Sequence, residues 1–180
     1  MLLDRLGMPF ECADPGLDET ALAGEAPADT AMRLARAKAR AVAPLYPDAL
    51  IIGADQVASC DGERLGKPGG HAAALRQLTR LSGRSARFDT AVCVLDAAGG
   101  SDPVRVVPCV VTFRTLSPAH IERYLRREKP YDCAGSAKSE GLGIALIAKM
   151  ETADPTSLVG LPLIALTELL AAAGCDVLGA

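Results

Sequence analysis

A carboxylate at the polar end of an apolar run is the strongest chemical signal in this sequence. Asp55 follows the apolar residues Leu50–Ala54 and precedes Gln56. Strands of α/β sheets commonly present catalytic groups at or near their carboxyl ends, where ligands bind. Gly53 and Ala54 add little bulk and leave space for a ligand beside the carboxylate. The pattern favours a functional role for Asp55, and a turn aspartate at the start of a hairpin is the alternative.

Three other charged residues could act on an anionic ligand, and each has an ordinary alternative. Alone, Glu19 in a polar loop is typical of a solvated acid, and Lys38 is typical of the charged face of a helix. Lys67 stands between a glycine and a proline, in a rigid turn that can hold an ammonium group near a phosphate. This turn is not a P-loop, because that motif needs a longer glycine-rich loop followed by Lys and Ser or Thr.

The segment AGSAKSEG, residues 134–141, places four polar side chains among small residues. They are Ser136, Lys138, Ser139 and Glu140. Loops rich in Gly, Ala and Ser allow a ligand to approach the backbone closely, and a plain surface loop is the alternative.

The composition excludes several classes of protein. The chain has 180 residues, a net charge of -3, 49% hydrophobic and 23% charged residues, which fits one globular domain. The net charge gives no general attraction for nucleic acid or for anionic lipid, so an anionic substrate must be held by a local cationic cluster. No apolar run approaches the ~20 residues that span a membrane, and no signal peptide opens the chain. We therefore expect a cytoplasmic protein that binds neither nucleic acid nor membranes.

The six cysteines indicate reduced thiols rather than a disulfide framework or a metal site. They are widely spaced, without a C-x-x-C pair, and only two histidines accompany them. Cys12, Cys93 and Cys109 lie in apolar runs that resemble strands, so we expect them in the core.

Hydrophobic periodicity and turn residues predict a single α/β domain over residues 1–180. Helices are predicted at Met1–Leu6, Ala26–Ala43, His71–Leu81, Pro118–Arg127 and Leu161–Ala173. Strands are predicted at Pro9–Ala13, Leu50–Ser59, Arg87–Asp96, Val104–Arg114 and Gly143–Met150, with a hairpin turn at Asp61–Gly62.

The order of these motifs is more specific than any one of them. DET, ARAKARA, GADQV, LGKP, AGSAKSEGLGI and DPTSLVGLPL follow one another along nearly the whole chain. Together they resemble the Maf family of nucleoside triphosphate pyrophosphatases. GADQ, AGSAKSEG and DPTSLVGLPLI are similar to the branch that hydrolyses 7-methyl-GTP. The branch that acts on dTTP and UTP has Thr after the strand aspartate and a neutral amide in place of Glu140.

The resemblance implies hydrolysis of a nucleoside triphosphate between its α and β phosphates. Asp55 would be the general base, and Glu19 would join it in holding Mg²⁺, Mn²⁺ or a similar divalent cation. Lys38 and Lys67 would neutralise phosphate charge. Glu140 and Gln56 would select the base, because N7 methylation makes guanine cationic and favours a facing carboxylate.

The resemblance also implies an inosine-triphosphatase-like fold, an elongated mixed sheet flanked by helices with a central cleft, and a homodimer. Family members open with a β-strand and a Ser-x-Ser-x-x-Arg-Arg phosphate loop, which this sequence lacks, so we expect a domain that is shorter at its N-terminus. Two alternatives to a 7-methyl-GTP pyrophosphatase follow. One is a pyrophosphatase for another modified or canonical nucleotide such as dTTP or UTP. The other is a non-catalytic nucleotide-binding protein or cell-division regulator.

Overall fold

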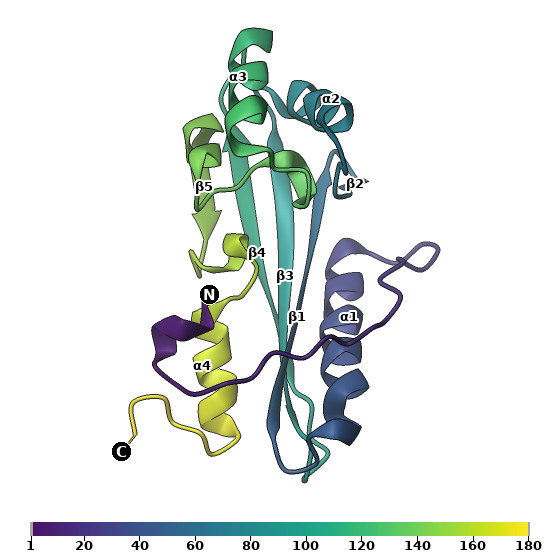
Figure 1. The fold of residues 1–180 in the computed structure, drawn as a ribbon, viewed down its shortest axis with the longest axis vertical. Helices are drawn as coiled ribbons and strands as arrows, with labels where there is room; N and C mark the ends of the chain where they lie inside the picture. Colours follow the sequence, from purple (N-terminus) through teal and green to yellow (C-terminus); the bar gives the residue numbers. More distant parts are fainter. Residues whose placement is uncertain (1, 180) are drawn as a thin grey trace. The chain divides into compact units, whose positions relative to one another are not determined.

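Five strands form one sheet in the order β2-β1-β3-β4-β5 in the computed structural model, which describes residues 2–179. The strands are β1 (Leu50–Cys60), β2 (Glu63–Leu65), β3 (Ser85–Asp96), β4 (Val104–Phe113) and β5 (Ile147–Thr152). The α-helices are α1 (Pro27–Val42), α2 (His71–Leu81), α3 (Pro118–Glu128) and α4 (Leu163–Ala172) (Figure 1). This arrangement confirms the predicted α/β class.

The chain is organised as two compact units. Unit 1 comprises residues 2–56, 89–107 and 154–179, and unit 2 comprises residues 57–88 and 108–153. The three longest strands, β1, β3 and β4, contribute residues to both units. Each unit is described below by itself.

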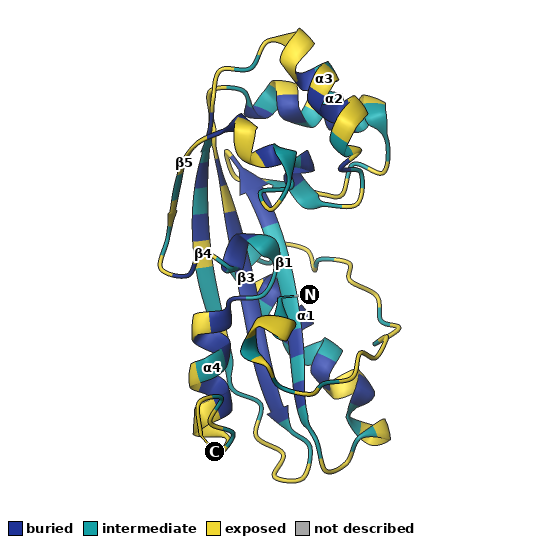
Figure 2. Ribbon diagram, turned by 60° about the vertical axis from the view of Figure 1, so that its left-hand side comes forward, coloured by how far each residue is buried: buried dark blue, intermediate teal, exposed yellow. Residues whose placement is uncertain are grey.

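In unit 1, the alternation of side chains along β1 places two helices on opposite faces of the sheet. Leu50 and Ile52 pack against the buried cluster that joins β3 to α4. Gly53 faces the other way and lies against the backbone of α1. Successive side chains of a strand point to opposite faces, so this register fixes which helix each residue of β1 meets. Figures 1 and 2 show α1 and α4 on opposite sides of these strands.

In unit 2, α2 and α3 pack together, and short antiparallel pairings complete the fold. Asp61 and Gly62 have positive φ angles of 51° and 79°, as a tight hairpin between β1 and β2 requires. At the start of α3, the Ser117 hydroxyl accepts a hydrogen bond from the His120 amide at 3.2 Å. Both the predicted hairpin and the predicted helix start are confirmed.

Two strand predictions are wrong in whole or in part. Pro9–Ala13 forms no strand: its backbone is irregular, and Cys12 is exposed rather than in the core. The predicted strand Gly143–Met150 begins only at Ile147, because Leu142–Leu146 form a 3-10 helix. Before the strand begins, this segment coils so tightly that a side chain at Gly143 would overlap the backbone of Lys138.

The remaining predictions concern the first helix, the thiols and the membrane. Leu3–Leu6 form a 3-10 helix that ends at Gly7 with a φ of 66°, and Met1 lies outside the described residues. All six cysteines have free thiols, and Cys93 and Cys109 are buried in the strands as predicted. Among residues 2–179, no helix is both long and apolar enough to cross a membrane.

Candidate active site

Asp55 and Gln56, which are adjacent in sequence, point to opposite faces of the sheet. Asp55 is directed to the α1 side, where its Oδ1 accepts a hydrogen bond from Lys38. Gln56 is directed to the α4 side, where it meets Ser157. Both residues lie in the middle of β1 rather than at its end, and the hairpin turn comes only at Asp61–Gly62. The alternative that Asp55 is a turn residue is therefore wrong.

Gly53 allows α1 to pack directly on β1. A Cβ atom at this position would overlap the Ala35 carbonyl oxygen and lie 2.9 Å from the Ala39 amide nitrogen. The helix backbone therefore fills the space beside Gly53. The prediction that this glycine leaves space for a ligand is wrong. Because α1 approaches so closely, Lys38 on that helix reaches Asp55 two residues further along the strand.

Lys38 bridges the two predicted acidic residues. Its Nζ lies 2.7 Å from Asp55 Oδ1 and 2.7 Å from Glu19 Oε1. The Asp55 side chain is 9% exposed, that of Lys38 is 20% exposed, and that of Glu19 is 46% exposed. Burial alone lowers the pKa of Lys38, but hydrogen bonds and charge from Asp55 and Glu19 outweigh it, so the pKa rises above its ordinary value. The cluster therefore keeps one cation between two carboxylates.

The loop that carries Glu19 is anchored to α1 by a second ion pair. Glu25 accepts hydrogen bonds from Arg33 Nε at 2.7 Å and Nη2 at 2.8 Å. Arg33 also donates to the Thr20 carbonyl oxygen at 3.2 Å, next to Glu19 in the chain. The hydrogen bonds from Arg33 and Thr30 lower the pKa of Glu25 to about 2. This charged clamp fixes the position of the Glu19 loop against the helix.

The amide nitrogen of Gln56 is committed to acceptors inside unit 1. Its two protons are shared among three acceptors, which are Thr90 Oγ1 at 2.9 Å, the Ser157 carbonyl oxygen at 2.9 Å and the Leu158 carbonyl oxygen at 3.2 Å. Thr90 is buried and donates its own hydroxyl to Ser157 at 2.9 Å, so its oxygen must accept from Gln56. A carbonyl oxygen can only accept, which fixes the orientation of the amide.

The DPTS motif builds the wall that Gln56 contacts. Asp154 accepts hydrogen bonds from the Thr156 backbone at 3.0 Å and from the Ile164 amide at 2.7 Å. Thr156 Oγ1 in turn accepts from the Leu163 amide at 2.8 Å. These two side chains satisfy amides at the start of α4, which have no partner within the helix. These contacts were not predicted, because the two side chains lie seven and ten positions from the amides that they accept from, whereas the residue directly before the helix, Pro162, makes no side-chain cap.

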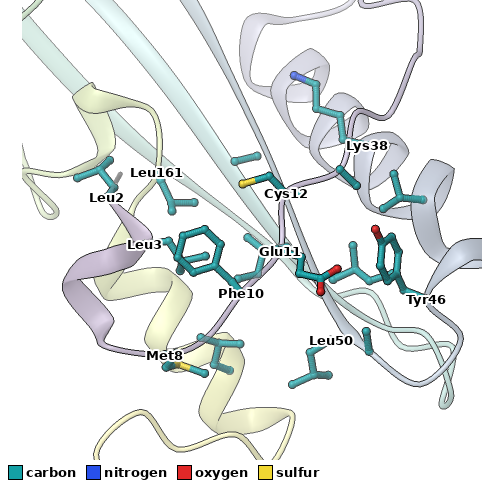
Figure 3. Close-up of a pocket in the computed structure, with 18 of the residues that line it drawn as sticks. Leu2, Leu3, Met8, Phe10, Glu11, Cys12, Lys38, Tyr46, Leu50 and Leu161 are labelled. Carbon is teal, nitrogen blue, oxygen red and sulfur yellow. The ribbon is translucent and has the colours of Figure 1, made fainter.

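A large cavity in unit 1 borders the charged cluster. Its volume is about 1150 Å³, and its walls come from the N-terminal segment, α1, the first half of β1 and α4. Phe10 and Cys12 line it from the irregular segment, and Lys38 lines it from α1 (Figure 3). Most of its lining side chains are apolar, which does not suit a triphosphate.

Lys67 and Glu140 lie in unit 2, and both are exposed. The Glu140 loop is held from α3, where Tyr124 Oη accepts from the Lys138 amide at 3.1 Å and Glu128 accepts from the Leu142 amide at 2.8 Å. Burial raises the pKa of Tyr124, which keeps its hydroxyl protonated. A side chain at Gly141 would lie 2.9 Å from the Glu128 carboxylate. The loop therefore has one fixed path beside α3.

The structure brings together some of the predicted site residues. Glu19, Lys38 and Asp55 form one cluster in unit 1, and Gln56 belongs to the same unit but to the other face of β1. That these residues share one cleft with Lys67 and Glu140 stays a prediction. The two carboxylates that converge on the Lys38 ammonium group could also supply oxygen ligands to a divalent cation. Mg²⁺ is commonly bound in this way, by one or two carboxylates together with the phosphates of a substrate.

Comparison with known proteins identifies the family. The family described as "Maf-like protein" matches residues 1–173 of this chain. The chain belongs to the Maf family.

Curated relatives cover nearly the whole of this Maf protein. The 7-methyl-GTP pyrophosphatase of Cupriavidus metallidurans is 54% identical over 179 residues, which are 99% of this chain and 90% of the relative. That of Methylobacillus flagellatus is 56% identical over 177 residues, 98% and 92% of the two chains. That of Burkholderia orbicola is 56% identical over 175 residues, 96% and 83% of the two chains. The resemblance inferred from the motifs is confirmed.

Proposed function

We propose that this Maf protein hydrolyses 7-methyl-GTP to 7-methyl-GMP and pyrophosphate. The observation that carries the proposal is its identity of 54–56% to relatives named 7-methyl-GTP pyrophosphatases, over nearly its full length. The Glu19–Lys38–Asp55 cluster supports it, because phosphoryl chemistry needs a base and cationic groups held in a fixed arrangement.

In the proposed reaction, water attacks the α-phosphorus and the bond from that atom to the bridging oxygen breaks. Pyrophosphate leaves with the bridging oxygen and its electron pair. Asp55 accepts a proton from the attacking water, and Lys38 holds the Asp55 carboxylate in place through its 2.7 Å hydrogen bond. Lys38 and Lys67 neutralise charge on the phosphate oxygens.

A divalent cation fits the donor atoms of this cluster. We assign its protein ligands to Asp55 and Glu19, whose carboxylates both lie 2.7 Å from the Lys38 ammonium group. When bound, the metal would polarise the phosphate oxygens and neutralise charge that develops on them. Binding of Mn²⁺, followed by the relaxation of water protons, tests the ligands without turnover: we expect weaker binding in Asp55→Asn and Glu19→Gln, and equal binding would remove them as ligands.

Two acceptors support the selection of a methylated guanine. The Gln56 amide nitrogen is occupied within unit 1, so Gln56 can offer a ligand only its oxygen. Glu140 offers an exposed carboxylate. Guanine presents hydrogen-bond donors, and N7 methylation adds positive charge, so acceptors and a negative charge favour it over uracil or thymine.

A panel of nucleoside triphosphates tests the proposed function. Pyrophosphate release is measured with 7-methyl-GTP, GTP, dTTP and UTP, and Asp55→Asn serves as the inactive control. We expect the highest kcat/KM with 7-methyl-GTP. A higher value with UTP or dTTP would assign the protein to the other substrate class, and binding without release would make it a nucleotide-binding protein. The predicted homodimer is tested separately by light scattering at micromolar concentration.

A further inference from the structure

The whole chain contains two side-chain carboxamides, because it has two glutamines and no asparagine. Gln56 is the one already described. Gln77, on α2 in unit 2, has no role in the chemistry discussed so far. Like Gln56, it is hydrogen-bonded to segments distant in sequence rather than to its own helix.

The two ends of the Gln77 amide hold two different loops. Its Nε2 donates to the Gly66 carbonyl oxygen at 2.7 Å, and its Oε1 accepts from the Ser136 hydroxyl at 2.6 Å. Gly66 directly precedes Lys67, and Ser136 begins the stretch that leads to Glu140. The Gly66 carbonyl can only accept a hydrogen bond, so the amide cannot be reversed without losing the contact.

The Ser136 contact lies at a conformationally costly position. Ser136 is 0% exposed and has a φ of 56°, in the left-handed region that serine rarely adopts. The preceding Gly135 has a φ of 74°, and a Cβ atom there would lie 3.2 Å from the Phe88 ring. Such conformations persist only where surrounding contacts fix them, and the bond to Gln77 is one of these contacts.

The Gly66 contact has a similar consequence for Lys67. Lys67 is exposed, so its own side chain does little to fix the position of its backbone. Hydrogen bonds to the flanking backbone groups do so instead, from Gln77 to the Gly66 carbonyl and from the Gly69 amide to the Tyr131 carbonyl at 2.9 Å. One of these two hydrogen bonds therefore depends on a single side chain, that of Gln77.

We propose that Gln77 is a positioning residue for nucleotide binding, which holds the Lys67 loop and the AGSAKSEG loop in fixed relation to each other within unit 2. The proposal rests on the proposed function, because Lys67 and Glu140 are the residues that it would position. Loops held in their binding conformation before the ligand arrives lose less entropy on binding. Gln77 therefore acts on affinity rather than on the chemical step.

Steady-state kinetics of the 180-residue protein test this role. In Gln77→Leu, we expect KM for 7-methyl-GTP to rise about five- to tenfold with kcat changed by less than about twofold, the pattern of lost uniform binding. Ser136→Ala removes one of the two contacts and should raise KM by a smaller factor. Thr79→Val is the matched control on α2, because within residues 2–179 its hydroxyl donates to the Leu75 carbonyl of the same helix at 2.8 Å and to no other segment.

A spectroscopic measurement keeps this inference separate from the proposed function. Only two side-chain amide pairs occur in the ¹H–¹⁵N spectrum, and Gln77→Leu assigns both by removing one. Ser136→Ala should shift the Gln77 pair and leave the Gln56 pair in place, whether or not the protein turns over substrate. An unchanged Gln77 pair, or a folded Gln77→Leu protein with unchanged KM, would overturn the positioning role. A loss confined to kcat would also contradict it.

Two further results, a Gln77→Leu variant that does not fold and an unaltered protein without activity, still leave the positioning role testable. If Gln77→Leu does not fold, Ser136→Ala and Gln77→Glu provide the same test, because a Glu side chain can accept from Ser136 but cannot donate to the Gly66 carbonyl. If the unaltered protein releases no pyrophosphate from any nucleotide, the proposed function fails. The positioning role is then decided by nucleotide binding affinity in the same variants.

Discussion

The predicted site residues are fixed in two physically different ways in the two units. In unit 1, Lys38 and Asp55 are largely buried and held by opposite charges at 2.7 Å. In unit 2, Lys67 and Glu140 are exposed, and the backbone around them is held by Gln77, Tyr124 and other polar groups. Electrostatic interactions are stronger where water is excluded. We therefore expect the chemical centre in unit 1, and ligand contacts from exposed side chains on fixed loops in unit 2.

The largest effect is expected from Asp55→Asn. This change keeps the shape of the side chain but removes the base and one metal charge, so kcat should fall about 10²–10⁴-fold with the fold intact. Pyrophosphate release measures the effect, and Glu151→Gln on the exposed strand β5 is the control. More than a tenth of the original rate in Asp55→Asn would show that Asp55 is not the base.

Gly53→Ala should destabilise unit 1 through a steric clash between β1 and α1. The added methyl group overlaps the Ala35 carbonyl oxygen, which belongs to backbone and cannot rotate away. We expect a loss of about 3 kcal/mol in the free energy of unfolding, the upper part of the range for overpacking. Thermal or urea unfolding measures the loss. Gly70→Ala, where a Cβ atom meets open space, should change stability far less; equal losses would contradict the close approach of α1.

Glu140→Gln should separate base choice from chemistry. Replacing the carboxylate by an amide of equal size removes the negative charge, so preference for 7-methyl-GTP over GTP or UTP should fall by ~1–3 kcal/mol, about 5- to 150-fold. The effect should appear mainly in KM. The ratio of kcat/KM values measures it, and an unchanged ratio would make Glu140 an ordinary loop residue. An equal fall of kcat for all substrates would move it into the catalytic centre.

The smallest effect concerns the clamp between Glu25 and Arg33. The pKa of Glu25 is lowered in the folded protein from its ordinary value of 4.5 to about 2. Its contribution to stability is therefore present above pH 4.5 and is lost as the pH falls towards 2. Melting temperatures are measured at pH 6, 4 and 3. The difference in melting temperature between the unaltered protein and Glu25→Gln should become smaller as the pH falls. A constant difference would indicate that the carboxylate charge does not act here.

Most elements of the fold were predictable because their patterns are local. The α2 boundaries, the hairpin at Asp61–Gly62 and the start of α3 depend on periodicity, turn residues and a helix cap, all of which neighbouring residues supply. The Pro9–Ala13 prediction failed because an apolar run becomes a strand only if another strand pairs with it. That partner is a property of the tertiary structure.

The sequence by itself determined the family, which the comparisons confirm, and it named the residues of the proposed site, whose roles stay predictions. It also determined that Asp55 and Gln56 point to opposite faces, because side chains alternate along any strand. Only the tertiary structure decided what each face meets. Asp55 meets Lys38, 17 positions away, and Gln56 meets the Ser157 carbonyl, 101 positions away. Every residue carries a carbonyl oxygen, so no pattern of side chains identifies which one Gln56 or Gln77 will bind; the packing of the chain selects it.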